Sequence, residues 1–404
     1  MATTKKTKIE LLSPAGDLER LKITLLYGAD AVYIGGREYS LRANATNFSI
    51  EEIKEACNFA HKLGKKVYLT TNIVFHNEDI EGIYDYLQKT YAAGIDAYIV
   101  SDPFIISYIK ENFKDVEVHV STQNSTCNKE AVNYLKSLGV DRVVPARELS
   151  KGEIKEIIDE CNIDIEVFIH GAMCTFYSGR CCLSNYLTNR DSNRGGCSQV
   201  CRFAFDINKE DSCNNKFTMA TKDLNMARYI QDMIDINIRS LKVEGRMRSH
   251  YYLATVMSSY RKIIDKCYEK TLTEDFLKSQ EKILARVANR ETSTHYFLKN
   301  ADESDQYYTG RQELSNQDYL ALVTAYDKNK KIVTLSERNY FEPNTEVEIF
   351  TPSGKVIGFV IETIYDEDMN ILQKACHPEE ILKIKLPATI TDDIEEYSMM
   401  RIKI

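Results

Sequence analysis

The sequence predicts an α/β fold: a TIM-type (β/α)8 barrel followed by a small antiparallel β-barrel. Eight short apolar runs alternate with helical stretches over about 260 residues, which is the number and length of units in a TIM-type barrel. Near-continuous apolar strands are also typical of a parallel sheet covered by helices. After residue 316 the apolar residues instead alternate with period two, with turn signals such as PSG between the runs.

The eight predicted barrel strands lie in the first 250 residues. They are 9–13, 31–36, 66–72, 97–101, 116–122, 142–146, 165–170 and 240–245. Helices are expected between them, for example at 17–27, 50–63, 80–93 and 129–138. A glycine follows each of these four helices, where a left-handed residue commonly ends a helix: Gly28, Gly64, Gly94 and Gly139.

A doubly wound open sheet is the alternative architecture, but no G-x-G-x-x-G follows any predicted strand. We therefore expect the TIM-type barrel at 1–270, a connecting helix and loop region at 271–315, and the C-terminal β-barrel domain at 316–404. The seventh strand is followed by a long cysteine-rich loop, 171–220. Loops at the carboxyl ends of barrel strands commonly carry the catalytic residues.

The start, MATTKKTKIELLSPAG, has no apolar signal region, and no run of eighteen apolar residues occurs. This predicts a cytoplasmic protein with no membrane partner. Cytoplasmic thiols stay reduced, so a local group of cysteines favours a metal, cluster or catalytic site over disulfides.

A net charge of -8 argues against a uniformly basic surface for nucleic acid. Residues 170–202 nevertheless carry four arginines against one acidic residue, Asp191: Arg180, Arg190, Arg194 and Arg202.

The same segment holds five of the eleven cysteines. If Cys174, Cys181, Cys197 and Cys201 are ligands, six, fifteen and three residues separate them in turn. Structural zinc sites usually bring two tight pairs of ligands, and only the last two cysteines fit that pattern. Iron-sulfur clusters accept more varied spacing, so an iron-sulfur cluster, zinc and ordinary buried thiols all remain alternatives. Cys182 adjoins Cys181 and would point to the opposite face of an extended segment, so we expect it not to be a ligand.

The run EVFIHGAMCTFYSGRCCLSNY resembles the defining motif of peptidase family U32. The resemblance extends over nearly the whole chain, through ELLSPAGDLERLKITLLYGADAVYIGG, HVSTQNSTCN, RVVPARELS, NRGGCSQVCR and LKVEGRMRSHYY. RNYFEPNTEVEIF and HPEE resemble the small C-terminal barrel of the shorter members.

This resemblance implies one of two activities. The older description of the family is peptidase or collagenase. The newer one is hydroxylation of RNA bases or ubiquinone precursors without molecular oxygen, on a four-cysteine iron-sulfur cluster. Members of this length resemble those needed for 5-hydroxyuridine at the wobble position of tRNA. The resemblance thus implies a [4Fe-4S] cluster on the four cysteines, with tRNA and prephenate or a similar small dicarboxylate as partners. Some relatives act in pairs, so a non-catalytic subunit that works with a homologous U32 chain is a further alternative.

A peptidase needs an activated nucleophile or a metal-bound water. The sequence has no H-E-x-x-H and no G-x-S-x-G. Cys174 as nucleophile with His170 as base is the arrangement a peptidase could use here, but it would leave the other three cysteines unexplained.

Hydroxylation of a base needs an accessible base, and the unpaired bases of an anticodon loop can be splayed into a pocket. Tyr177, Phe176 and Tyr186 flank the cysteines and could stack on a base, or could simply pack the loop. Arg180 and the neighbouring arginines are candidates for phosphate contacts.

A dicarboxylate is bound best by the planar fork of arginine. Candidates at strand ends are Arg147, Arg246 and Arg248. Lys242 and Glu244 are catalytic candidates beside them, and Glu244 is alternatively a group that orients Arg246. Polar residues follow other strands and are expected to face the same pocket, with His170 as the proton carrier: Ser13, Asn72, Ser121, Gln123 and His170.

Overall fold

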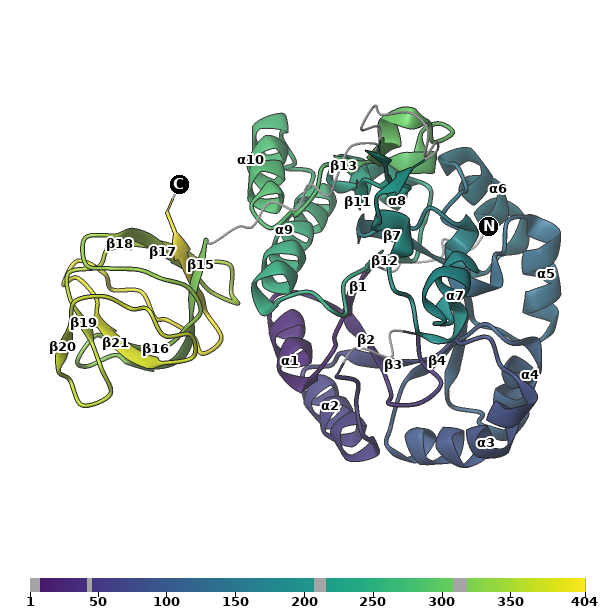
Figure 1. Cartoon of the computed structure of the whole chain (residues 1–404), viewed down its shortest axis with the longest axis horizontal. Coiled ribbons are helices and arrows are strands. Elements are labelled where there is room, and N and C mark those ends of the chain that lie inside the picture. The colour runs from purple at the N-terminus through teal and green to yellow at the C-terminus, as the bar shows by residue number, and fades with distance from the viewer. Residues whose placement is uncertain (1–7, 42–45, 207–215, 308–317, 404) are drawn as a thin grey trace.

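The structure is a computed structural model that describes residues 8–41, 46–206, 216–307 and 318–403. Cys213 and the predicted domain boundary at 315/316 lie outside these residues. Two sheets dominate the fold (Figure 1), a parallel barrel and a C-terminal antiparallel sheet. Within the described residues, none of the helices combines the length and the apolar character needed to cross a bilayer.

The parallel sheet closes into a barrel of eight strands. Each strand pairs in parallel with the next, and β12 pairs with both β7 and β1, which completes the ring. The predicted TIM-type architecture is therefore confirmed. The strands are β1 (Glu10–Pro14), β2 (Ala31–Gly35), β3 (Lys66–Thr71), β4 (Ala97–Val100), β5 (Glu117–Val120), β6 (Arg142–Val143), β7 (Asp164–Gly171) and β12 (Ser240–Val243).

Helices surround the barrel: α1 (Leu18–Leu26), α2 (Ile50–Lys62), α3 (Asn77–Ala92), α4 (Pro103–Asn112), α5 (Lys129–Ser137), α6 (Lys151–Cys161), α8 (Ile230–Asp235) and α9 (His250–Glu269). The four glycines predicted to follow helices all have positive φ, between 67° and 112°. Their helices therefore end at the left-handed residue that the sequence indicates.

Two elements differ in length from the prediction. Only Arg142 and Val143 of the predicted strand 142–146 pair as β6, because Pro145 has no N–H to donate to a ladder. Helix α3 begins three residues before the predicted start, because the Asp79 carboxylate accepts the His76 backbone N–H at 2.7 Å and caps the helix there.

The barrel interior is apolar on one side and ionic on the other. The apolar side is a cluster of Leu12, Ala31, Tyr33, Tyr68, Ala97 and Ile99. On the ionic side, Arg142 Nη1 lies 2.6 Å from Glu10 and 3.0 Å from Glu166, and Lys242 Nζ lies 2.7 Å from Glu166. All four side chains are buried. Burial alone would raise the pKa of Glu166, but Lys242 and Arg142 outweigh it and lower the pKa to about 2.

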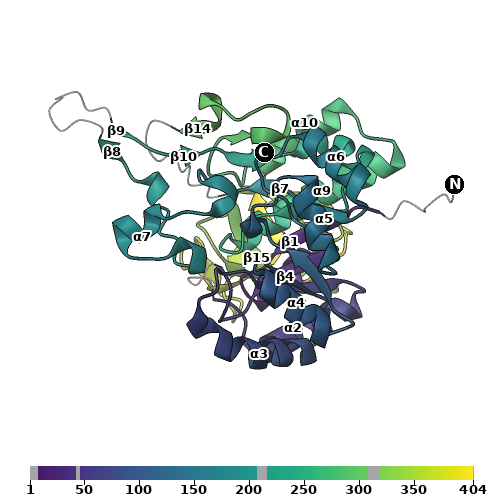
Figure 2. The same ribbon diagram turned by 90° about the vertical axis from the view of Figure 1, so that its right-hand side faces the viewer.

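After β7 the chain rises over the carboxyl ends of the strands before it returns to the barrel. Figure 2 shows this cysteine-rich segment at the left of the molecule. Between β7 and α8 the chain forms α7 (Leu183–Thr188), β8 (Phe205–Asp206), β9 (Lys216–Phe217), β10 (Ala220–Thr221) and β11 (Asp223–Asn225). Beyond α9, the connecting region contributes α10 (Glu274–Ala285), β13 (Thr292–Ser293) and β14 (Gln306–Tyr307).

The C-terminal sheet packs around its own core and docks on α1, α9 and α10 (Figure 1). Its strand order is β18-β17-β22-β15-β16-β21-β19-β20. The strands are β15 (Tyr319–Asp327), β16 (Ile332–Glu337), β17 (Glu346–Phe350), β18 (Val356–Val360), β19 (Ile364–Tyr365), β20 (Ile371–Leu372), β21 (Ile381–Lys385) and β22 (Met399–Ile402). Tyr27, which follows α1, donates to the Phe350 carbonyl, Tyr251 of α9 stacks on Tyr319, and Arg286 pairs with Asp318 at 2.8 Å.

We expect Glu166→Gln to lower the free energy of unfolding by about 3–5 kcal/mol, because it leaves Arg142 and Lys242 buried with one fewer counter-charge. The wild-type pKa of Glu166 is depressed, so its stabilisation is present above pH 4.5 and is lost as the pH falls towards about 2. Denaturant unfolding across this pH range measures both effects. Glu160→Gln, in an exposed ion pair, is the control and should cost less than about 1 kcal/mol. Equal losses for the two variants would contradict the account.

Candidate active site

A cavity of about 370 Å³ lies at the carboxyl end of the barrel, under the cysteine-rich segment. Residues from the strand ends and from that segment line it together. The predicted site residues in its wall are Asn72, Gln123, Arg147, Cys174, Cys181, Cys197, Cys201, Lys242, Glu244, Arg246 and Arg248. Ser121 and Phe176 line it as well.

The four predicted cysteine ligands therefore face one cavity, although they come from separate turns of the segment. Cys181 is buried, and the other three are partly buried. Burial raises the pKa of the Cys174 and Cys201 thiols, and the neighbouring cysteines add to this effect. Cys182 is exposed and does not line the cavity. In the part of the chain that the structure describes, no three His, Cys, Asp or Glu side chains are gathered closely enough to hold a single metal ion.

Asn193 fixes the position of Cys181. Its Oδ1 accepts the Cys181 backbone N–H at 3.2 Å, and its Nδ2 donates to the Cys181 carbonyl at 3.0 Å. Gln123, from the loop after β5, donates to the same Oδ1 at 3.4 Å. One amide side chain thus holds both backbone groups of a cysteine and connects them to the barrel.

Glu148, from the loop after β6, fixes the turn between Cys174 and Cys181. Its carboxylate accepts the Ser178 backbone N–H at 2.6 Å and the Ser178 hydroxyl at 3.0 Å. Ser178 has φ 49°, a left-handed conformation that is unfavourable for serine. The charge-assisted hydrogen bonds hold the serine in this conformation.

Two of the four arginines in the segment are engaged with the barrel. Arg194 binds both Glu78 and Asp79 of α3, so it anchors the segment and does not offer its charge to solvent. Arg180 is exposed, and its Nε donates to the Gln123 carbonyl at 2.9 Å. Arg190 is exposed, and Arg202 lines the cavity.

The barrel contributes a cationic wall to the cavity. Arg147 stacks on Phe168, with the guanidinium carbon 3.9 Å from the ring centroid. Arg246 is buried and donates to the Ser40 and Thr70 hydroxyls at 2.9 and 3.3 Å. A Cβ on Gly35 would lie 1.8 Å from its Nη1, so only glycine leaves room for this guanidinium. Glu244, half-buried in the same wall, accepts the Tyr33 hydroxyl at 3.2 Å.

The structure does not place His170 or Ser13 in this cavity, contrary to expectation. Ser13 has the same parity as Leu11 in β1, so its side chain faces the helices. A bulge at Ile169 turns His170 the same way, since the register runs from Lys242↔Phe168 to Val243↔His170.

His170 instead packs on α9, with Nδ1 3.2 Å from the Tyr260 hydroxyl. Burial lowers its pKa to about 3, and the charge of Arg248 adds to the effect. A neutral histidine behind the wall cannot be the proton carrier that we expected. Tyr177 also lies outside the cavity: it is exposed, and its hydroxyl is 3.1 Å from Cys127 Sγ.

The sequence analysis missed Asp223, Arg290 and the buried Glu10–Arg142–Glu166 network. Charged residues inside the strands that hold Glu10, Arg142 and Glu166 could have indicated that network. For Arg290 there was no signal, because it reaches the cavity from the connecting region after α10.

The fold and the cavity define a (β/α)8 barrel protein with a cysteine-lined cavity over the carboxyl ends of its strands. The chain belongs to peptidase family U32. The model of that family matches residues 16–307, and the model of the family's C-terminal domain matches residues 315–401.

Relatives in this family carry different names. The chain is 47% identical to "tRNA hydroxylation protein P1" of Bacillus subtilis (strain 168), over 95% of its own length and 93% of that protein. It is 34% identical to "23S rRNA 5-hydroxycytidine C2501 synthase" of Escherichia coli (strain K12), over 75% of its length and 44% of that protein. It is also 34% identical to a "Collagenase" of Porphyromonas gingivalis (strain ATCC BAA-308 / W83), over 72% of its length and 73% of that protein.

We expect Glu148→Gln to release the turn at Ser178, because a charge-assisted pair of hydrogen bonds is lost. Hydrogen exchange at the Ser178 amide should become about tenfold faster or more. Glu153→Gln is a matched control, since Glu153 likewise accepts the N–H and O–H of a serine, Ser150, but at the start of α6. Unchanged exchange at Ser178 would show that Glu148 does not hold the turn.

Proposed function

We propose that this protein is an RNA hydroxylase that converts C5–H of the wobble uridine of tRNA to C5–OH without molecular oxygen. The observation that carries the proposal is the joining of four cysteines and a cationic wall in one cavity, in a chain 47% identical to a tRNA hydroxylation protein. The rRNA 5-hydroxycytidine synthase among the relatives supports the same chemistry, hydroxylation at C5 of a pyrimidine.

The proposed cofactor is a [4Fe-4S] cluster held by Cys174, Cys181, Cys197 and Cys201. A single zinc ion with Zn–S bonds of about 2.3 Å needs four sulfurs drawn tightly together. Structural zinc sites usually bring two tight pairs of ligands, and only Cys197 and Cys201 form such a pair, whereas a cluster receives each thiolate on a different iron and accepts more varied spacing. Gly179 also lines the cavity, and because it has no side chain its backbone can lie close to a bulky group. The donor set thus fits a cluster better than the alternative, zinc.

When bound, an iron-sulfur cluster supplies one-electron redox chemistry to the cavity. The protein side chains bind and orient the substrates and transfer protons. Glu244 is the carboxylate among the described lining residues, and it accepts the proton that leaves C5. Lys242, which lies 2.7 Å from Glu166, provides a positive charge at the floor of the cavity.

The second proposed substrate is prephenate or a similar small dicarboxylate, which donates the oxygen atom and is itself reduced by the two electrons that the pyrimidine loses. Arg147 has no carboxylate partner among the described residues; it contacts the Ala172 carbonyl, Met173 and the Phe168 ring. An arginine with available donors beside an aromatic ring suits an anion with a carbon ring.

The rim of the cavity carries the features of a surface for unpaired RNA. Tyr177, Tyr186 and Phe203 are exposed, at 53%, 86% and 47%. Exposed Arg180 and Arg190 lie on the same segment. Aromatic faces that stack on bases, together with arginines that bind phosphate, are typical of single-strand recognition. In the C-terminal sheet acidic residues outnumber basic ones, so we assign the tRNA contacts to the rim.

The collagenase among the relatives keeps a peptidase as the alternative function. The pair that a cysteine peptidase would use is not assembled: His170 binds Tyr260 behind the wall, while Cys174 faces the cavity. The other alternative is a non-catalytic subunit that needs a homologous U32 chain. Activity of the single chain would contradict this alternative.

After oxygen-free purification we expect about four iron and four sulfide ions per chain, with a visible absorption band. Serine at any of the four cavity cysteines should remove most of the iron, because each thiolate holds one iron. Cys182→Ser is the internal control and should keep the full content, since Cys182 lies outside the cavity. Stoichiometric zinc without iron would refute the cluster.

Anaerobic incubation of the single chain with unmodified tRNA and prephenate should add one oxygen atom to the wobble uridine, detected by nucleoside mass spectrometry. Glu244→Gln should lower the rate about 100-fold or more, because it removes the proton acceptor, while leaving iron content intact. Activity only with a second U32 chain would support the subunit alternative. Hydrolysis of a peptide instead would support the peptidase.

A further inference from the structure

Asp223 holds two arginines of the cavity wall at once. Its Oδ2 lies 3.2 Å from Arg248 Nη2, and its Oδ1 lies 3.0 Å from Arg290 Nη1. The side chains of Asp223 and Arg290 are each 8% exposed, and that of Arg248 is 22% exposed. Both arginines line the cavity. The three residues therefore form a nearly buried ion triad at its edge.

The triad depends on strands outside the barrel. Strand β11, which begins at Asp223, pairs with the end of β7 on one side and with β13 on the other. The Asp223 backbone N–H donates to the Glu291 carbonyl at 3.0 Å, which places Arg290 beside the Asp223 carboxylate. A residue from the connecting region is thus brought to the cavity by a short ladder.

Arg248 is the member of the triad with donors left for a ligand. Its side chain lies 5.0 Å over the Tyr252 ring, and only its Nη2 meets a protein acceptor in the described residues. Its backbone carbonyl is held by Arg20 at 2.8 Å. Nη2 has two N–H groups and Asp223 accepts one of them, so the other can form a fork that matches a carboxylate together with either Nη1 or Nε.

The charge of Asp223 would neutralise Arg248 if the two were alone. Arg290 binds the second oxygen of the same carboxylate, so Asp223 can hold Arg248 in place without cancelling its charge.

We infer that Asp223 and Arg290 are positioning residues that hold Arg248 as the anchor for a carboxylate of a small molecule. The low exposure of the triad excludes a phosphate within a polynucleotide, which carries a ribose on each side. A small carboxylate can enter the cavity of about 370 Å³. The inference rests on the proposed function only in taking this cavity as the reaction site.

The test measures binding of phthalate, an aromatic dicarboxylate, and of uridine monophosphate to the purified full chain by calorimetry, without RNA. Arg248→Gln should weaken phthalate binding about tenfold or more, because a charge-assisted pair is lost, and leave uridine monophosphate within about twofold. Arg228→Gln is the matched control. Arg228 also binds two carboxylates, Glu274 and Glu281, but outside the cavity, so phthalate binding should not change.

The Asp223→Asn variant distinguishes a positioning role of Asp223 from an effect of its negative charge alone. If Asp223 only offsets positive charge, the variant should bind phthalate more tightly; if it positions Arg248, binding should weaken about threefold to tenfold although a negative charge has been removed. All variants are compared at a temperature where circular dichroism shows them folded, so that lost stability is not mistaken for lost binding.

Unchanged or tighter phthalate binding by Asp223→Asn would overturn the inference. Loss of uridine monophosphate binding rather than phthalate binding in Arg248→Gln would also overturn it. Phthalate binding that depends on Arg248 in a chain without hydroxylase activity would refute the proposed function alone.

Discussion

A buried chain of charges underlies the site: Glu166 lies between Arg142 and Lys242 inside a closed barrel. Arg142 also binds Glu10, which in turn accepts the Tyr68 and Ser240 hydroxyls. Because each charge has an opposite neighbour, the interior tolerates ions where most barrels have aliphatic side chains. The last member, Lys242, is also part of the cavity floor, so the interior and the site share one set of contacts.

The cysteine-rich segment is attached to this scaffold by polar contacts rather than by an apolar core of its own. Glu148 and Gln123 reach it from the segments after β6 and β5, and Asp79 reaches it from α3. The residues that they contact, Ser178, Asn193 and Arg194, all lie between Cys174 and Cys197 in the sequence. The spacing of the four thiols is therefore set by the barrel as much as by the segment.

Local periodicity was sufficient to predict the barrel, since all eight strands and the four glycines that follow helices are found where the sequence indicates them. The four cysteines could also be assigned to one cavity, because they belong to one loop at the catalytic end. Side-chain direction was harder. One extra residue, Ile169, turns the His170 side chain to the opposite face of the strand, and no pattern in the sequence reveals this bulge. Contacts between distant segments, such as Asp223 with Arg290, were likewise invisible, because they depend on a ladder between two very short strands.

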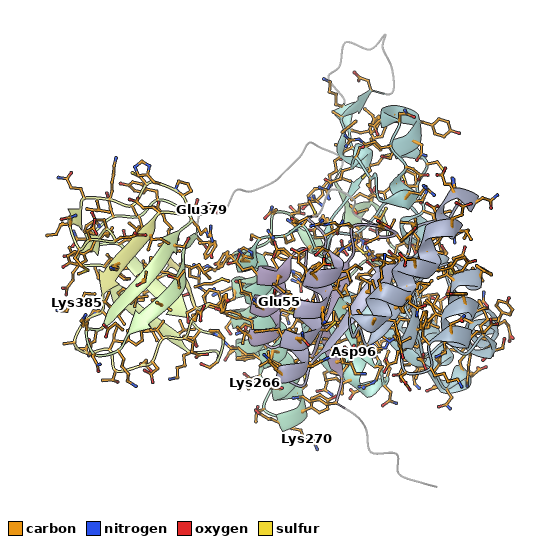
Figure 3. All side chains as sticks on the ribbon, turned by 90° about the horizontal axis from the view of Figure 1, so that it is seen from below. Glu55, Asp96, Lys266, Lys270, Glu379 and Lys385 are labelled. Carbon is orange, nitrogen blue, oxygen red and sulfur yellow. The ribbon has the colours of Figure 1, made fainter. Side chains whose placement is uncertain are left out.

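Helix α9 touches both parts of the molecule. Tyr251 stacks on Tyr319 of the C-terminal sheet, while the next residue, Tyr252, lies beneath Arg248. Figure 3 shows the far end of this helix, at Lys266 and Lys270, pointing away from the cysteine-rich segment. The helix therefore connects the C-terminal sheet with the wall of the cavity. Because Tyr251 and Tyr252 are neighbours in the chain, one turn of helix both packs against the C-terminal sheet and supports Arg248.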